Sequence, residues 1–194
     1  MKSIIRKILN KYSYFELKKK AHLIIGADSV VNYRSFDLQN NKNCRFVIGE
    51  KSSVSASFIF EKDEATIEIG RNTFLGGCVL SCAEKIKIGE NVFIAWNVTI
   101  FDHNSHSLNY NVRRNDLPNL FNKNKTWEDV GISPTIIEED VWVGVNAIIL
   151  KGIIIGKGAI VAAGAVVTKN VPPNTLVAGN PAQVVKELKN ENNI

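Results

Sequence analysis

An aliphatic residue recurs at every sixth position through the C-terminal third of the chain. The members of this series are Ile137, Val143, Ile149, Ile155, Val161 and Val167. A helix spaces its buried positions by 3.6 residues and a half-buried strand by two, so neither explains this pattern. A six-residue period sustained over six units predicts a solenoid of short stacked strands, in which three hexads form one triangular coil.

Shorter series in other phases continue the pattern towards the N-terminus. They are Ile88, Ile94 and Ile100, then Ile69, Leu75 and Ser81, then Ile48, Val54 and Phe60, and finally Ile25 and Val31. Four places after each C-terminal marker stands a second apolar or small residue: Val141, Ala147, Ile153, Ala159, Ala165 and Val171. Two side chains of each strand are therefore predicted to point inward, and Gly144, Gly156, Asn91, Asn97 and Asn146 are predicted to form tight corners. About six coils are expected.

The chain divides into three expected parts. Residues 1–22 form a basic N-terminal helical segment, residues 23–182 form the solenoid with a protruding, structureless loop at 101–135, and residues 183–194 form a C-terminal helical tail. The sequence contains no 18-residue apolar stretch and no signal-peptide pattern. Its three cysteines form no C-x-x-C pair, which suits a reducing compartment. These features predict a cytoplasmic protein.

Positive charge is concentrated at the N-terminus. Seven cations (Lys2, Arg6, Lys7, Lys11, Lys18, Lys19 and Lys20) against one carboxylate give residues 1–20 a charge of +6, which leaves −1 of the net +5 for the rest. The solenoid therefore has no basic stripe, and nucleic-acid binding is disfavoured. Ile4, Ile5, Ile8 and Leu9 fall at helical spacing beside the cations. This segment is expected either to pack against the open end of the solenoid or to make weak contact with a membrane surface.

The long loop contains two of the three histidines, His103 and His106. Insertions of this size are more often functional than idle, and histidine suits proton transfer near neutral pH. The alternative, two histidines with no chemical task, stays open. A metal would need a third ligand at a recognisable spacing, so no metal is expected. No G-x-S-x-G elbow or P-loop occurs, and Cys78 and Cys82 stand at repeat positions close to the core, where a reactive thiolate is unfavourable.

Four motifs, together with the histidine-bearing loop, carry a family signature. They are NVFIAWNVTI at 91–100, VWVG at 141–144, AAGAVVTK at 162–169 and GNPA at 179–182. In these motifs the chain resembles the hexapeptide-repeat O-acetyltransferases, over roughly residues 65–188. This family includes the galactoside, maltose and xenobiotic acetyltransferases and the O-acetyltransferases of capsule and lipopolysaccharide sugars. The resemblance implies an all-β fold, a left-handed parallel β-helix, with acetyl-CoA as co-substrate and a homotrimer whose sites lie between adjacent prisms.

The resemblance also implies roles for particular residues. In galactoside-type relatives the first histidine of the loop deprotonates the acceptor hydroxyl without an acyl-enzyme, and His103 matches it. Some polysaccharide-modifying relatives instead have one histidine in an Asp-x-His-Ser context, which His106-Ser107 resembles. Asp102 or a backbone carbonyl is expected to orient His103. The implied donor-binding residues are Trp142, Ala163, Thr168, Lys169 and Lys186.

The leading hypothesis is an acetyl-CoA-dependent O-acetyltransferase that modifies a hydroxyl of a sugar or glycan precursor. One alternative is an N-acetyltransferase acting on a nucleotide-linked amino sugar. Two others, a γ-carbonic-anhydrase-like metalloprotein and a non-catalytic scaffold, belong to different functional classes. The expected partners are a saccharide acceptor and further copies of the chain, and no nucleic acid.

Overall fold

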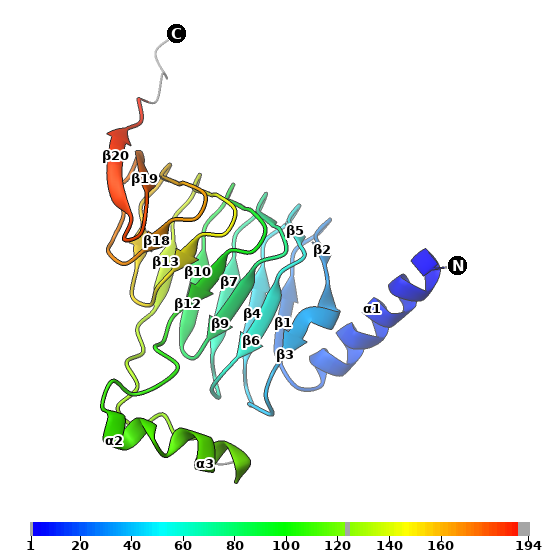
Figure 1. The fold of residues 1–194 in the computed structure, drawn as a ribbon. Coiled ribbons are helices and arrows are strands. Elements are labelled where there is room, and N and C mark those ends of the chain that lie inside the picture. Colours follow the sequence, from blue (N-terminus) through cyan, green and yellow to red (C-terminus); the bar gives the residue numbers. More distant parts are fainter. Residues whose placement is uncertain (1, 123–124, 190–194) are drawn as a thin grey trace.

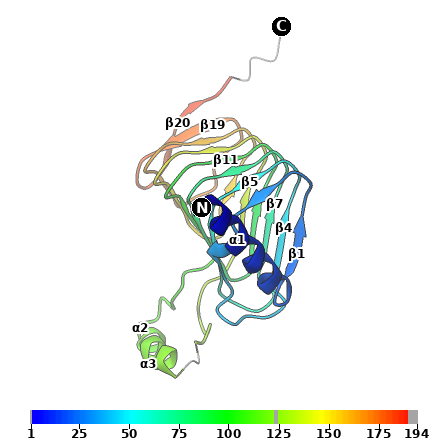
Figure 2. The ribbon, with the colours of Figure 1, turned by 90° about the vertical axis from the view of Figure 1, so that its right-hand side faces the viewer.

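The computed structural model describes residues 2–122 and 125–189. They form a three-sided parallel β-solenoid with a helix at its N-terminal end, as Figure 1 shows. Figure 2, turned by 90°, shows the coils stacked behind one another and the helices α2 and α3 hanging from one side. The predicted left-handed parallel β-helix is confirmed.

Each side of the prism is one sheet. Sheet A contains β1 (His22–Ile25), β4 (Arg45–Ile48), β7 (Thr66–Ile69), β10 (Lys85–Ile88), β13 (Thr135–Ile137) and β16 (Ile154–Ile155). Sheet B contains β2 (Val30–Val31), β5 (Ser53–Val54), β8 (Phe74–Leu75), β11 (Phe93–Ile94), β14 (Trp142–Val143), β17 (Ile160–Val161), β19 (Thr175–Ala178) and β20 (Gln183–Glu187). Sheet C contains β3 (Phe36–Asp37), β6 (Ser57–Phe60), β9 (Val79–Cys82), β12 (Thr99–Phe101), β15 (Ile148–Ile149) and β18 (Val166–Val167). Six complete coils result, and β19 begins a seventh.

The predicted hexad markers align in sheets A and B. Sheet A stacks Ile25, Ile48, Ile69, Ile88, Ile137 and Ile155, and sheet B stacks Val31, Val54, Leu75, Ile94, Val143 and Val161. The second inward positions, Val141, Ala147, Ile153, Ala159, Ala165 and Val171, are all buried as predicted. Burial of these apolar columns is the main favourable contribution to folding, because one coil alone encloses little.

Sheet C differs from the prediction in its first coils. Leu80, rather than Ser81, pairs with Ile100, and Phe58, rather than Phe60, pairs with Leu80. Both β6 and β9 are four-residue strands in which alternate side chains face inward, so each offers two candidate markers. The corners before these strands are also shorter than the later ones, and the six-residue count therefore fails there.

The predicted corner residues act in two ways. Asn91, Asn97 and Asn146 adopt positive φ angles of 57°, 57° and 61°, which asparagine tolerates better than most residues. Gly144 and Gly156 serve instead where coils approach closely. A Cβ at Gly144 or Gly156 would lie 2.6 Å from a backbone nitrogen of the next coil.

Two predictions about segments outside the prism were wrong. The tail at 183–194 is not helical in its described part, because β20 pairs antiparallel with β19 and covers the free edge of sheet B. Residues 190–194 lie outside the described residues. The loop at 101–135 is not structureless, since it contains the short helices α2 (Tyr110–Arg113) and α3 (Asp116–Phe121).

The N-terminal helix α1 (Lys2–Lys18) packs against the first coil. This is the first of the two arrangements expected for the basic N-terminal segment. Leu17 is buried, and the Tyr14 ring lies 5.0 Å from that of Tyr33 in the 3-10 helix η1 (Tyr33–Ser35). The Asn10 side chain donates to the Val31 carbonyl at 2.8 Å and accepts from the Tyr33 N–H at 2.7 Å. Within the described ranges, no helix combines the length and apolarity needed to cross a bilayer.

Candidate functional site

The long loop leaves the prism at the edge between sheets C and A, after β12, and returns at β13. Asp102 fixes its first residues. The Asp102 carboxylate is fully buried and accepts hydrogen bonds from the N–H groups of Ala83, Glu84 and Lys85, each at 2.7 Å. Asp102 therefore holds the loop to the preceding coil. No hydrogen bond joins it to the His103 ring, and neither of the two expected orienting partners, Asp102 or a backbone carbonyl, bonds that ring.

His103 is only 4% exposed and is bonded through both ring nitrogens. Its Nδ1 accepts the Ser105 N–H at 2.9 Å, and its Nε2 lies 3.1 Å from Ser81 Oγ. Because a backbone N–H can only donate, the neutral ring carries its proton on Nε2 and donates it to Ser81. Ser81 in turn donates to Glu61 at 3.2 Å. His103 thus ties the loop to the solenoid.

Burial lowers the pKa of His103 below its ordinary value, and the nearby cation of Lys125 acts in the same direction. The carboxylates of Asp102 and Glu61 oppose this shift without overcoming it. The ring is therefore neutral at neutral pH, which agrees with the hydrogen bond that Nδ1 accepts.

This shift predicts a pH-dependent stability. Protonating His103 costs more in the folded state than in the unfolded state, where the pKa is about 6.5. The stabilisation is thus present above that pH and is lost as the pH falls below it, by at most about 1.4 kcal/mol per pH unit. Denaturant unfolding in mildly acidic and neutral buffers should show this slope reduced in His103→Gln and unchanged in His22→Gln. Equal slopes in the parent and in His103→Gln would contradict the assignment.

His106 has a different environment. Its side chain is 57% exposed, and its Nδ1 lies 2.5 Å from Oδ2 of Asp116, the first residue of α3. When Nδ1 carries the proton and donates it to the carboxylate, Nε2 is left as a proton acceptor. A carboxylate that orients imidazole in this way is the usual arrangement around a histidine general base.

His106 and Asp116 line a cavity of about 430 Å³. Its other walls come from the loop and from two corners of the solenoid: Gln39, Glu61, Ser105, Arg113, Leu117, Leu120, Lys125 and Thr126. The lining combines apolar side chains, both signs of charge and hydrogen-bonding groups. Such a cavity suits a polar molecule with an apolar face.

The returning half of the loop is held by further contacts. Ser107 is buried and donates to Asp129 at 2.6 Å. The His103 and Trp127 rings pack edge to face with their centroids 5.3 Å apart. Lys125 Nζ lies 4.3 Å from the centroid of the Trp127 ring and donates to Glu61 at 2.7 Å. These contacts order both halves of the loop around the cavity.

Sequence reasoning missed Asp116 as a functional residue. It stands ten positions after His106, and only the turn through α2 brings its carboxylate back to the imidazole. The available signal in the sequence was the pair Asn115-Asp116, because an asparagine followed by an acidic residue is typical of the start of a helix.

The implied donor-binding residues occupy more than one edge of a single prism. Trp142 is exposed on sheet B, and Ala163 is exposed in the turn between sheets B and C, so it does not stack inward. Thr168 and Lys169 are exposed at the next edge, where the chain passes from β18 back to sheet A. Lys186 is exposed on β20. The fold of one chain therefore does not gather them into one cluster.

Other reactive groups lie apart from the cavity. Burial raises the pKa of Cys78 to about 12, and burial with the nearby Asp102 carboxylate also raises that of Cys82. Neither thiol is therefore suited to nucleophilic attack, as expected. In the described part of the chain, no three His, Cys, Asp or Glu side chains converge as metal ligands.

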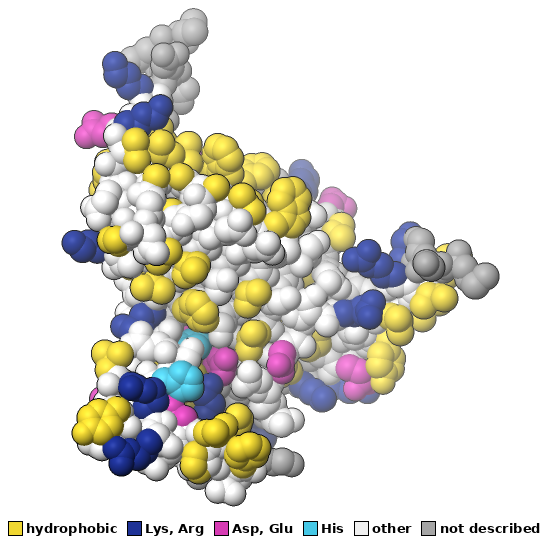
Figure 3. Space-filling model, viewed as in Figure 1, with side chains coloured by type: hydrophobic (Ala, Val, Ile, Leu, Met, Phe, Trp, Pro, Cys, Tyr) yellow, Lys and Arg dark blue, Asp and Glu magenta, His cyan; other side chains and the backbone are white. Residues whose placement is uncertain are grey.

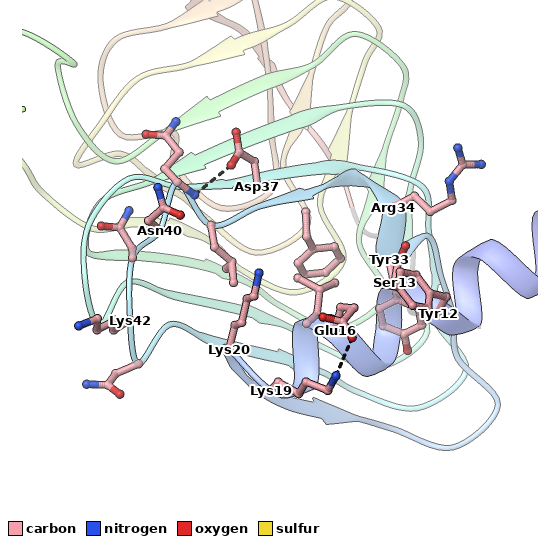
Figure 4. Close-up of a pocket in the computed structure, with 16 residues that line it drawn as sticks. Tyr12, Ser13, Glu16, Lys19, Lys20, Tyr33, Arg34, Asp37, Asn40 and Lys42 are labelled. Atoms are coloured by element: carbon pink, nitrogen blue, oxygen red, sulfur yellow. Dashed lines mark hydrogen bonds and ion pairs between the residues drawn. The ribbon is translucent and has the colours of Figure 1, made fainter. Parts of the chain in front are cut away.

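A second cavity, of about 800 Å³, lies between α1 and the first coil and contains no predicted site residue (Figure 4).

Comparisons with known proteins agree with the fold and the repeat. Residues 134–169 match the family described as the hexapeptide repeat of succinyl-transferase. Galactoside O-acetyltransferase of Escherichia coli K12 is 31% identical over 143 residues, which are 73% of this chain and 63% of that enzyme. A hexapeptide-repeat acetyltransferase of Vibrio cholerae O1 biovar eltor, solved with acetyl coenzyme A, is 28% identical with a TM-score of 0.52, covering 91% of this chain and 76% of that one.

A further solved structure matches the fold alone. An N-acyltransferase of Bacillus cereus, in complex with dTDP and coenzyme A, has a TM-score of 0.65 at 16% identity, covering 90% of this chain and 89% of that one. Fold and repeat together define the class: the protein is a hexapeptide-repeat β-helix. Its similarity to acetyltransferases over most of its length relates the chain to the hexapeptide-repeat acyltransferases.

Proposed function

We propose that the protein transfers an acetyl group from acetyl-CoA to a hydroxyl of a sugar or glycan precursor. The observation that carries the proposal is the His106–Asp116 pair on the wall of a cavity, in a chain whose relatives are acetyltransferases. The chain spans 63% of the galactoside enzyme, and the proposal concerns the transfer step rather than that enzyme's acceptor.

The proposed reaction is a direct transfer. His106 Nε2 takes the proton of the acceptor hydroxyl while the hydroxyl oxygen attacks the thioester carbonyl of acetyl-CoA. The tetrahedral intermediate then collapses, the C–S bond breaks, and the thiolate of CoA receives the proton from His106. Asp116 orients the ring and stabilises the imidazolium formed between these steps. Holding both substrates together removes much of the entropic barrier, so no acyl-enzyme is required.

His106 suits this role better than His103. The galactoside-type resemblance favoured the first histidine of the loop, but both nitrogens of His103 are already bonded inside the protein. To act as a base, His103 would have to break its bond to Ser81 and become exposed. His106 is already exposed, and its bond to Asp116 prepares Nε2 to accept a proton. The proposed division of labour is proton transfer by His106 and positioning of the loop by His103.

The positions of the donor residues support a homotrimer. Trp142 and Ala163 belong to sheet B and its edge, whereas Thr168 and Lys169 lie at the edge from which the loop leaves. One CoA molecule can contact both groups if they come from adjacent copies of the chain. In this arrangement Lys169 or Lys186 would meet the nucleotide phosphates as a point charge. The proposed active site then lies between prisms.

The cavity lining supports a saccharide acceptor. Leu117 and Leu120 supply apolar contact for the face of a sugar ring, while Gln39, Arg113 and Lys125 supply hydrogen bonds to hydroxyl or acidic groups. An amine of a nucleotide-linked amino sugar is the second candidate acceptor. Short matches to 2,3,4,5-tetrahydropyridine-2,6-dicarboxylate N-acetyltransferases, one of them 54% identical over 61 residues, favour transfer to nitrogen without indicating an amino sugar.

The experiment is an acetyl-transfer assay on the purified full chain. We expect free CoA to form from acetyl-CoA only when a suitable saccharide from a panel is present, and the product to be an alkali-labile ester. An alkali-stable amide would instead favour the N-acetyltransferase. Absence of saturable CoA binding would contradict the proposal in favour of a scaffold. Stoichiometric zinc in protein purified without chelator would support the metalloprotein.

A further inference from the structure

The helix α1 presents an unusual outer surface. Six large apolar side chains on it are between 42% and 65% exposed: Ile4, Ile5, Ile8, Leu9, Tyr12 and Phe15. At 3.6 residues per turn these positions fall within an arc of about 140°. They therefore form one continuous stripe, which we call the apolar stripe of α1. Single exposed apolar residues are ordinary on protein surfaces, but a contiguous stripe indicates a binding surface.

This stripe is not the face that packs on the solenoid. Asn10, Tyr14 and Leu17 make the contacts with the first coil, and they lie on the opposite side of the helix. Figure 1 shows α1 leaving the first coil with its N-terminal turns projecting away from the solenoid. The helix is thus fixed by its inner face while the stripe stays accessible.

A row of cations borders the apolar stripe. Lys7 and Lys11 lie one turn apart and Lys18 two turns further on, all on the arc between the packed face and the stripe, and all three are exposed. Figure 3 shows cationic and hydrophobic side chains gathered on this projecting helix. The first twenty residues carry +6, whereas the rest of the chain carries −1. The charge that would attract an anionic partner is therefore concentrated on α1 and the two lysines that follow it, Lys19 and Lys20.

We propose that α1 docks the protein onto an anionic lipid surface. An amphipathic helix that lies in a membrane interface inserts its apolar face below the headgroups, while flanking lysines meet the negative charge of the lipids. The apolar stripe and the lysine row have this arrangement. A protein partner would also need an acidic surface beside an apolar groove, and the strong segregation of charge favours the lipid. This proposal does not depend on the proposed acetyl transfer.

The test is cosedimentation of the full chain with lipid vesicles. We expect vesicles of phosphatidylcholine with phosphatidylglycerol to bind the protein at least about tenfold more strongly than phosphatidylcholine alone. Ile4→Asp/Ile8→Asp and Lys7→Glu/Lys11→Glu should each lower this binding by more than about tenfold. Raising the salt concentration should weaken the binding of the parent protein to the anionic vesicles. The apolar stripe and the lysine row would then both be required.

Matched controls replace the same residue types elsewhere on the surface. Val184→Asp/Val185→Asp changes two exposed apolar residues of β20, and Lys51→Glu/Lys189→Glu changes two exposed cations. Both controls should bind the vesicles like the parent protein. Equal binding by all variants, or no binding by the parent, would overturn the proposal. So would a change in oligomeric mass in the α1 variants without vesicle binding in the parent, since a second copy would then cover the stripe.

Discussion

Replacing His106 with alanine is expected to lower kcat/KM for acetyl transfer by about 10² to 10⁴-fold, the usual contribution of a general base. Asp116→Asn is expected to reduce kcat by at least about tenfold, because the amide no longer stabilises an imidazolium. The affinity for acetyl-CoA should change little in either variant. Steady-state assays with acetyl-CoA and an accepted sugar measure these effects.

Chemical rescue separates a proton-transfer role from a structural one. Free imidazole should restore part of the activity of His106→Gly, because it can enter the exposed cavity and accept the proton. His103→Gly should not be rescued, because its ring fills a closed position bonded to Ser81 and Ser105. His22→Ala is the control and should retain full activity, because His22 does not line the cavity. Rescue of the His103 variant with full activity in His106→Ala would reverse the assignment.

The fold was predictable wherever the repeat was strict. From β14 to β18 each hexad contributes one strand of two residues and one tight corner, so the six-residue period in the sequence is there also the period of the structure. In β6 and β9 the strands are longer, and two inward residues compete as the marker. Spacing alone cannot choose between Phe58 and Phe60, because both are buried.

The tail shows how a neighbouring edge decides local structure. Residues Gln183 to Glu187 have no strong preference that excludes a helix, and the helical prediction was reasonable from the sequence. In the structure they pair with β19, whose backbone groups would otherwise remain open at the end of sheet B. The determining interaction joins β20 to another strand, so it cannot be read from the tail alone.

The site was predictable by residue type but not by geometry. A long insertion with two histidines in a regular solenoid indicated His103 and His106 as candidates. Their burial and partners, which distinguish them, depend on contacts between distant positions. Asp116 reaches His106 only after the chain has turned through α2, and Asp102 binds three backbone groups of the preceding coil.

The buried Asp102 carboxylate is expected to be the most sensitive polar position for stability. Asp102→Asn leaves one oxygen acceptor where two are used, so an amide N–H would face the donor of Ala83. Leaving such a buried donor unsatisfied typically costs about 1–3 kcal/mol, and loss of the charge-assisted bonds adds to this. We expect the free energy of unfolding to fall by about 3 kcal/mol, measured by denaturant titration.

Asp102→Asn should also loosen the backbone beside Asp102 under conditions in which the rest of the protein stays folded. Amide hydrogen exchange is expected to accelerate most at Ala83, whose N–H loses its acceptor, and less at Glu84 and Lys85, whose remaining oxygen acceptor loses its charge. Asp140→Asn, at an exposed corner, is the matched control and should stay within about 0.5 kcal/mol of the parent. Because Asp102 directly precedes His103, the same variant should also lose acetyl-transfer activity through a displaced loop. An Asp102→Asn variant with parental stability and parental exchange rates would show that the loop is held by other contacts.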